Sequence, residues 1–108
     1  MILQKRDTIN LVKEISKRLK EKYNAKEVIL FGSYAKGTAD EDSDLDLLII
    51  ATTQEHFFKR LATVTRLTRD LIKKIPVSPI VFTPEEIENS LKRGDQFIQE
   101  ILERGIKA

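Results

Sequence analysis

The chain has 108 residues, 41% of them hydrophobic and 33% charged, and its formal net charge is +2. This length predicts a single domain over residues 1–108, built on one hydrophobic core. The absence of cysteine excludes disulfide bonds, zinc–thiolate sites and thiol catalysis. No long apolar run and no charged leader occurs, so we expect a cytoplasmic protein that does not cross a membrane. The basic residues are dispersed, which argues against nucleic acid as a partner.

The first half of the chain predicts one long helix and two strands. Apolar residues at three- and four-residue spacing predict an amphipathic helix over residues 8–23, with Asp7 or Thr8 as its N-cap. Two apolar segments rich in branched side chains predict buried strands over residues 26–31 and 44–50.

A polar segment connects these two strands. Residues 33–36 predict one helical turn that Gly37 ends, and residues 38–43 predict a solvated loop. Asp40 and Asp42 are typical of turns in which a side-chain carboxylate accepts a backbone N–H. The alternative for this loop is an acidic cluster that attracts metal.

The second half begins with a long helix and an edge strand. Residues 54–74 carry an apolar stripe that predicts a helix, with Phe57 and Phe58 in the core or, alternatively, one of them at a partner surface. Residues 77–82 predict a strand, and Pro79 within it predicts an edge position because proline cannot donate to the ladder. The apolar stripe of the helix comprises Phe57, Phe58, Leu61, Val64, Leu67, Leu71 and Ile72.

The last predicted helix starts at Pro84, with Glu85 and Glu86 at the positive end of its dipole. Gly94 predicts a kink or a break, and Gly105 predicts the end of the helix. Its expected buried side consists of Ile87, Leu91, Ile98, Ile101 and Leu102.

Together these elements predict an α/β (α+β) fold, a small mixed sheet packed with helices. The first strand ends at a Gly-Ser pair and the second begins with two aspartates. If both groups face one site, the two strands run antiparallel. The long helix between the second and third strands predicts a parallel, right-handed crossover. The candidate site then lies at one end of the sheet.

Gly32 and Ser33 follow the first strand directly. Gly32 has no Cβ and tolerates positive φ, so the backbone there can approach a ligand closely. Ser33 offers a hydroxyl and a backbone N–H at the start of a helical turn, which suits a phosphate oxygen. Lys36, one turn later, can neutralise phosphate charge. We therefore predict that Gly32, Ser33 and Lys36 bind a nucleotide.

Asp44 and Asp46 lie two residues apart at the start of the second strand, so we expect both carboxylates on one face. Magnesium prefers oxygen ligands and is commonly held by one or two carboxylates together with substrate phosphates. The pair is therefore the candidate catalytic centre and the candidate site for one or two Mg²⁺ ions.

The pattern Gly32-Ser33, ten residues, then Asp44-x-Asp46 resembles the signature of the DNA polymerase β-like nucleotidyltransferase superfamily. The compact length and the tail over residues 97–102 (FIQEIL) are similar to its minimal members. The resemblance implies a polymerase β-like fold that transfers a nucleoside monophosphate, usually AMP from ATP, with two Mg²⁺ ions. Minimal members are commonly encoded beside a HEPN-domain ribonuclease, which implies an antitoxin that in some cases adenylylates a tyrosine of the toxin.

One position departs from the family pattern. Active members usually carry a third carboxylate on the next strand, where this chain has Ser78. A serine hydroxyl is a poorer Mg²⁺ ligand, so activation of the attacking hydroxyl should be weaker. Asp70, Glu85 or Glu86 could substitute if the geometry allows, and a partner could also lend a carboxylate.

Two further residues are candidates for a place near the site. His56 is the only histidine, and its position away from the motif predicts a solvated or capping role. Tyr34 follows Ser33 and is expected either to pack in the core or to line the nucleotide pocket.

Two functions stay open at this point. The first is an Mg²⁺-dependent protein adenylyltransferase whose acceptor is a HEPN-domain partner. The second is a catalytically weak nucleotidyltransferase fold that neutralises the toxin by contact alone. The sequence leaves the acceptor, the base preference and any homo-oligomer undetermined.

Overall fold

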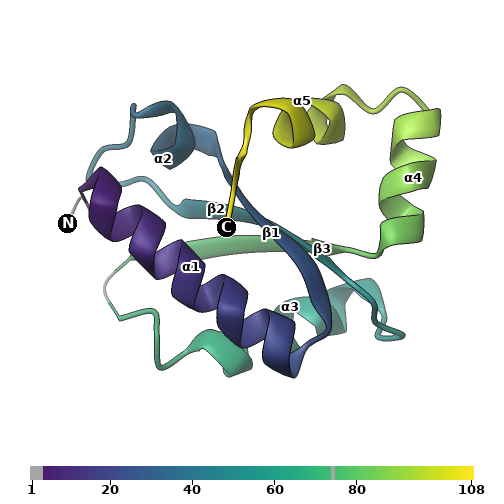
Figure 1. Ribbon diagram of the computed structural model, residues 1–108, viewed down its shortest axis with the longest axis horizontal. Coiled ribbons are helices and arrows are strands. Elements are labelled where there is room, and N and C mark those ends of the chain that lie inside the picture. The colour runs from purple at the N-terminus through teal and green to yellow at the C-terminus, as the bar shows by residue number, and fades with distance from the viewer. Residues whose placement is uncertain (1–3, 74) are drawn as a thin grey trace.

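The computed structural model of the protein, which describes residues 4–73 and 75–108, centres on a four-stranded sheet in the order β3-β2-β1-β4 (Figure 1). Within the described part, no helix is both long and apolar enough to traverse a bilayer. The strands are β1 (Ala25–Phe31), β2 (Leu45–Ala51), β3 (Val77–Phe82) and β4 (Ile106–Lys107). The helices are α1 (Lys5–Lys22), α2 (Gly32–Lys36), α3 (Phe57–Thr68), α4 (Pro84–Lys92) and α5 (Gln96–Arg104).

The pairing of the strands confirms the predicted topology. β1 pairs antiparallel with β2, and β2 pairs parallel with β3 after the crossover through α3. β3 occupies an edge of the sheet, as Pro79 predicted. β4 was not predicted, because a two-residue strand carries no pattern of its own. It forms only by antiparallel pairing with β1, where Ile29 is opposite Lys107.

The two faces of the sheet carry separate cores. Figure 1 shows α1 and α3 below the sheet and α4 and α5 above it. Alternate side chains of β2 divide between these faces. Leu47 and Ile49 belong to the core with α1 and α3, whereas Leu48 and Ile50 belong to the core with α4 and α5. By the same alternation, Asp46 emerges on the face of α4 and α5.

The start of α1 differs from the prediction. The helix begins at Lys5, and the N-cap is Gln4, whose side chain makes no capping bond. Thr8 is buried inside the helix, and its hydroxyl donates to the carbonyl of Gln4 at 3.0 Å. Asp7 lies in the first turn, where the helix dipole favours an acid. Both predicted caps were therefore wrong, because the helical hydrogen bonding extends back to Gln4.

α3 is shorter than the helix predicted over residues 54–74, whose last residue lies outside the described part of the chain. The Thr53 hydroxyl accepts the Glu55 N–H at 3.1 Å and closes a local turn, so the helix starts only after it. Phe57, Phe58 and Leu61 are 50%, 85% and 47% exposed, so their predicted core position is wrong. Instead, α3 buries Arg60, Val64 and Thr68.

The C-terminal helical segment is broken where Gly94 predicted it. Gly94 has φ 75°, and α4 and α5 lie on either side of it. Thr83 caps α4 in a reciprocal capping box, and the Asp95 carboxylate caps α5 by accepting two backbone N–H groups. Gly105 ends α5 as predicted. Of the predicted buried side, Leu91 is the exception, being 42% exposed.

Candidate active site

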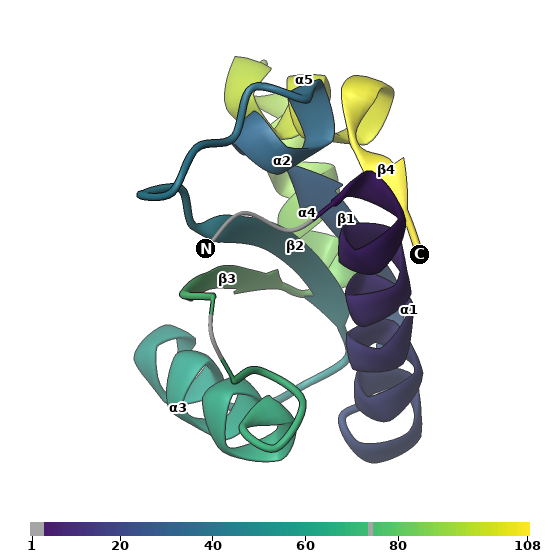
Figure 2. The ribbon, with the colours of Figure 1, turned by 90° about the vertical axis from the view of Figure 1, so that its left-hand side faces the viewer.

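The end of β1 and the start of β2 lie side by side at one end of the sheet. Phe31, the last residue of β1, pairs with Asp46. Gly32 then opens α2, and Gly37 ends it in the left-handed conformation, as predicted. The polar loop that follows returns the chain to Asp44. Figure 2 shows this loop projecting beyond the sheet, with α2 above β2.

Gly32 lies directly against the Asp46 carboxylate. Its φ of 74° is a conformation that residues with a Cβ rarely adopt. A Cβ at this position would overlap Asp46 Oδ2 and would lie 3.1 Å from Asp46 Cγ. From the sequence, this glycine is expected to let the backbone approach a ligand closely. In the structure the glycine also makes room for the carboxylate itself.

Asp44 and Asp46 differ in their surroundings. Asp44 precedes β2 and is exposed, whereas Asp46 lies in the strand and is half-buried. Burial, together with the nearby negative charge of Asp44, raises the pKa of the Asp46 carboxyl. Neither carboxylate forms an ion pair within residues 4–73 and 75–108. Two adjacent oxygen ligands that lack a cation are a donor set that suits Mg²⁺.

Ser78 completes the arrangement on the third strand. The parallel register places it opposite Asp46, the position expected from the family pattern. Its hydroxyl donates to Asp44 Oδ2 at 3.0 Å. The described residues contain no group of three or more acidic or histidine side chains placed to hold a metal. Ser78 therefore stands where the family pattern has a third carboxylate, and its hydroxyl holds Asp44 in place.

The three acids considered as substitutes for that carboxylate do not replace it. Asp70 pairs with Arg18 of α1 at 2.8 Å. Glu86 pairs with a buried arginine of α3 at 2.6 Å. Glu85 and Glu86 both follow the far end of β3, and Ser78 lies near its start. The strand separates them by roughly 13 Å, at about 3.3 Å per residue.

Ser33 and Lys36 occupy opposite ends of α2. The N-cap residue, Phe31, makes no side-chain bond to the helix, so the N–H groups of the first turn are available to a ligand. Ser33 belongs to that turn and is half-buried. Lys36 is the last residue of α2 and is exposed. The structure thus brings Gly32 and Asp46 into contact and places Lys36 further away, toward α5.

The helices α2 and α5 are neighbours in Figures 1 and 2. A hollow of about 650 Å³ lies between them. Phe97 of α5 meets Phe31 edge to face, with ring centroids 5.7 Å apart. Sequence reasoning did not place the α5 side chains at the site. The available signal was the four-residue spacing of Glu100 and Arg104, which puts both on one side of the helix. The hollow is lined by Phe31, Gly32, Ala35, Lys36, Phe97, Glu100, Ile101, Arg104 and Gly105.

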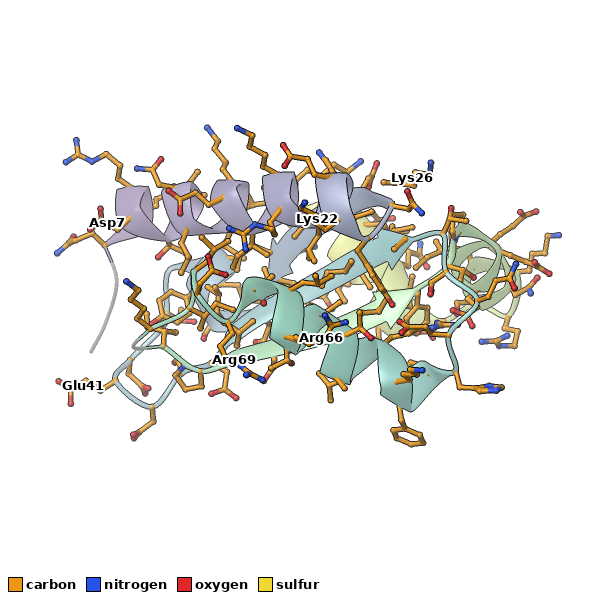
Figure 3. All side chains as sticks on the ribbon, turned by 90° about the horizontal axis from the view of Figure 1, so that it is seen from below. Asp7, Lys22, Lys26, Glu41, Arg66 and Arg69 are labelled. Carbon is orange, nitrogen blue, oxygen red and sulfur yellow. The ribbon has the colours of Figure 1, made fainter. Side chains whose placement is uncertain are left out.

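The other residues singled out in the sequence lie apart from this centre. Tyr34 packs in the core with α1, and its buried hydroxyl has no hydrogen-bond partner among the described residues. His56 is the exposed N-cap of α3 and makes no capping bond. Asp40 accepts the Asp42 N–H at 2.9 Å, so the turn interpretation of the loop is confirmed. Figure 3 shows Glu41 pointing into solvent at the tip of this loop.

Known proteins share this architecture. The family described as nucleotidyltransferase domain matches residues 12–108. This chain belongs to the nucleotidyltransferase domain family. A Methanocaldococcus jannaschii protein named "putative protein adenylyltransferase" is 37% identical over 101 residues, which cover 86% of this chain and 65% of that protein. A second protein of that name and organism is 35% identical over 96 residues, covering 87% of this chain and 90% of that protein.

A solved structure supports the same assignment. A "putative nucleotidyltransferase" from Sulfolobus solfataricus matches with a TM-score of 0.58 and 26% sequence identity. The match covers 79% of this chain and 75% of that one. The nucleotidyltransferase family, predicted from the Gly-Ser and Asp-x-Asp pattern, and the mixed α/β fold, predicted from the order of strands and helices, are therefore confirmed.

Proposed function

We propose that this nucleotidyltransferase is an Mg²⁺-dependent protein adenylyltransferase that transfers AMP from ATP to a hydroxyl of a partner protein. One observation carries the proposal: Asp46 lies against Gly32 with Asp44 near it, and neither carboxylate is paired with a cation in the described part of the chain. A perturbed carboxylate of this kind is typical of a functional site. The names of the relatives support a protein acceptor.

In this proposal each residue has a separate role. Asp44 and Asp46 hold the metal, which when bound neutralises phosphate charge and polarises the reacting groups. Ser33 and the free N–H groups of the first turn of α2 bind phosphate oxygens. Gly32 allows the Asp46 carboxylate to lie against α2, so the metal ligands and the phosphate ligands are neighbours. The Ser78 hydroxyl orients Asp44.

The proposed reaction exchanges a phosphoanhydride bond of ATP for a phosphoester bond on the acceptor. The acceptor oxygen forms a bond to the α-phosphorus of ATP, and its proton is released. The bond from the α-phosphorus to the oxygen that bridges to the β-phosphate breaks. Pyrophosphate leaves with that electron pair, and AMP stays on the acceptor.

We propose a HEPN-domain toxin as the acceptor, which makes the protein an antitoxin that acts in the cytoplasm. The exposure of Asp44 supports a macromolecular acceptor, because it leaves one side of the centre open to a large partner. The resemblance to minimal nucleotidyltransferases supports the choice of partner.

Intact-mass measurement on the purified pair, with ATP and Mg²⁺, tests the proposal. The partner should gain one adenylyl group with the wild-type protein and none with Asp46→Asn. Chelation of the metal should also prevent the gain. A wild-type mixture with a competent partner that shows no gain in mass would contradict the proposal.

The serine at position 78, where the family pattern has a third carboxylate, favours a second candidate, neutralisation by contact alone. A hydroxyl in place of a carboxylate leaves fewer charged ligands at the centre. In that case Asp44→Asn leaves neutralisation of the toxin intact. Ser78→Asp separates the two candidates further: a sharp rise in AMP transfer shows that the missing carboxylate limits an otherwise competent enzyme.

A further inference from the structure

The hollow between α2 and α5 adjoins the aspartate pair. Gly32 both lines the hollow and lies against the Asp46 carboxylate. Phe31 also lines it and is the strand partner of Asp46. Side chains directly opposite each other on antiparallel strands have Cβ atoms about 5 Å apart and share one face of the sheet. A molecule held at one end by Asp46 therefore reaches into the hollow with its other end.

The walls of the hollow suit a flat ring. Its volume of about 650 Å³ is within the range of small-molecule pockets. Phe97 meets Phe31 edge to face, at an interplanar angle of 85°. It remains 54% exposed, although it is a large apolar side chain at a pocket wall. Much of its ring is thus available for contact with a ligand.

Three charged side chains line the same hollow. Glu100 and Arg104 come from α5 and Lys36 from α2. None of the three forms an ion pair within the residues that the structure describes. An ionised Glu100 only accepts hydrogen bonds, whereas Arg104 and Lys36 only donate them. The set matches a ligand that combines aromatic faces, an amino group and acceptor atoms.

We propose that this hollow is the nucleoside pocket, in which the adenine of ATP lies against Phe97 and its amino group donates to Glu100. The inference rests on the proposed function, which places the α-phosphorus at Asp44 and Asp46. The hollow receives the base and not the phosphates, because the proposed function places the phosphates beside Asp44, Asp46 and the first turn of α2. The pocket accordingly selects ATP over ITP, whose carbonyl replaces the amino group and faces the same carboxylate.

Calorimetric titration with ATP, ITP and tripolyphosphate, each with Mg²⁺, tests the pocket. Loss of base stacking in Phe97→Ala should weaken ATP binding about tenfold and leave tripolyphosphate binding unchanged. Phe97→Tyr keeps the ring and should retain the affinity for ATP, which separates stacking from misfolding. Phe58→Ala is the matched control, since Phe58 is an exposed phenylalanine of α3 outside the hollow.

Glu100→Gln tests the choice of base. Glutamine offers both an acceptor and a donor, so the ratio of ATP to ITP affinity should fall toward one. A purely structural role for Glu100 would change both affinities alike.

Two results would overturn the inference alone. One is ATP binding that depends on Asp46 but is the same in Phe97→Ala as in the wild type. The other is tripolyphosphate binding that Phe97→Ala weakens and Glu100→Gln strengthens, which would place phosphates in the hollow. A wild-type protein that binds neither ATP nor tripolyphosphate contradicts the proposed function, and this inference fails with it.

Discussion

Two carboxylates at opposite ends of the sheet differ in their partners, because among the described residues one is paired with a cation and the other is not. Glu86, at the far end of β3, is paired with the buried Arg60 at 2.6 Å and accepts the Thr83 N–H at 2.8 Å. Asp46, at the near end, is half-buried, and the described residues offer it no cation. The first carboxylate is used to hold the fold together. The second is available to a ligand from outside the chain. We therefore assign the end of the sheet that carries Asp46 to function.

The titration of the two groups reflects the same contrast. The hydrogen bond from Arg60 lowers the pKa of the Glu86 carboxyl. Burial raises the pKa of the Asp46 carboxyl. Ionised Glu86 therefore stabilises the folded state, whereas ionised Asp46 destabilises it.

The largest expected effect comes from filling the space beside Asp46. Gly32→Ala introduces a Cβ that overlaps the Asp46 carboxylate, so AMP transfer should fall by at least about 100-fold through loss of metal positioning. Gly37→Ala is a matched control, because Gly37 has nearly the same φ of 77° and no atom within 4 Å of its added Cβ. Both variants should lose about 1 kcal/mol of stability from backbone strain. Equal loss of transfer in both would show that strain alone matters. Initial rates and urea unfolding measure the two quantities.

At the opposite end of the sheet, Arg60→Met should destabilise the fold without changing the site. The arginine also donates to the carbonyls of Val81 and Glu55, so its loss leaves buried acceptors unpaired. We expect a loss of about 2 kcal/mol, moderated because Glu86 is partly exposed. Chemical denaturation measures it, and nucleotide affinity below the transition should stay constant. Lys92→Met removes an exposed helical pair instead and should cost less than about 0.5 kcal/mol.

Glu86 also makes stability depend on pH. Its pKa is lowered in the folded state, so its contribution is present above the ordinary value of 4.5 and is lost as the pH falls through the folded value. Glu86→Gln keeps the capping acceptor but removes the charge. Urea midpoints of the two proteins should therefore differ at neutral pH and converge in acid. A difference that stays constant down to acid pH would contradict the assigned role of the charge.

The smallest expected effect is a slight gain in stability, opposite in sign to the losses above. The pKa of Asp46 is raised, so the folded state is penalised as the pH rises through that value. Asp46→Asn removes the charge with little change in shape. Its thermal midpoint at neutral pH, without metal, should be slightly above that of the wild type, although AMP transfer is lost. A clear drop in the midpoint would mean that Asp46 serves the fold.

Local patterns were enough to predict three of the four strands and the end of the sheet that carries the Gly-Ser turn and the Asp pair. The Gly-Ser turn ends one apolar strand and the Asp pair begins the next. Both groups lie at one end of the sheet only if these two strands run antiparallel. Pro79 identified the edge strand, and Gly94 identified the break between α4 and α5, since both act through their own backbone.

What the patterns missed depends on contacts between distant segments. Phe57 and Phe58 fit a helical stripe, but they are exposed and α3 buries Arg60 instead. That arginine is buried because Glu86, 26 residues away, pairs with it. The aromatic wall of the hollow, where Phe97 meets Phe31, likewise depends on how α5 docks across the sheet. No single segment carries these signals.

The central claim is that Asp44 and Asp46 form a metal-dependent nucleotide site, and calorimetric titration of Mg²⁺ and ATP tests it most directly. The wild type should bind ATP only when Mg²⁺ is present, and Asp46→Asn should lose that binding. Asp42→Asn makes the same change in the adjacent loop and should bind as the wild type does. Equal binding by the wild type and Asp46→Asn, or binding that Mg²⁺ does not affect, would contradict the account.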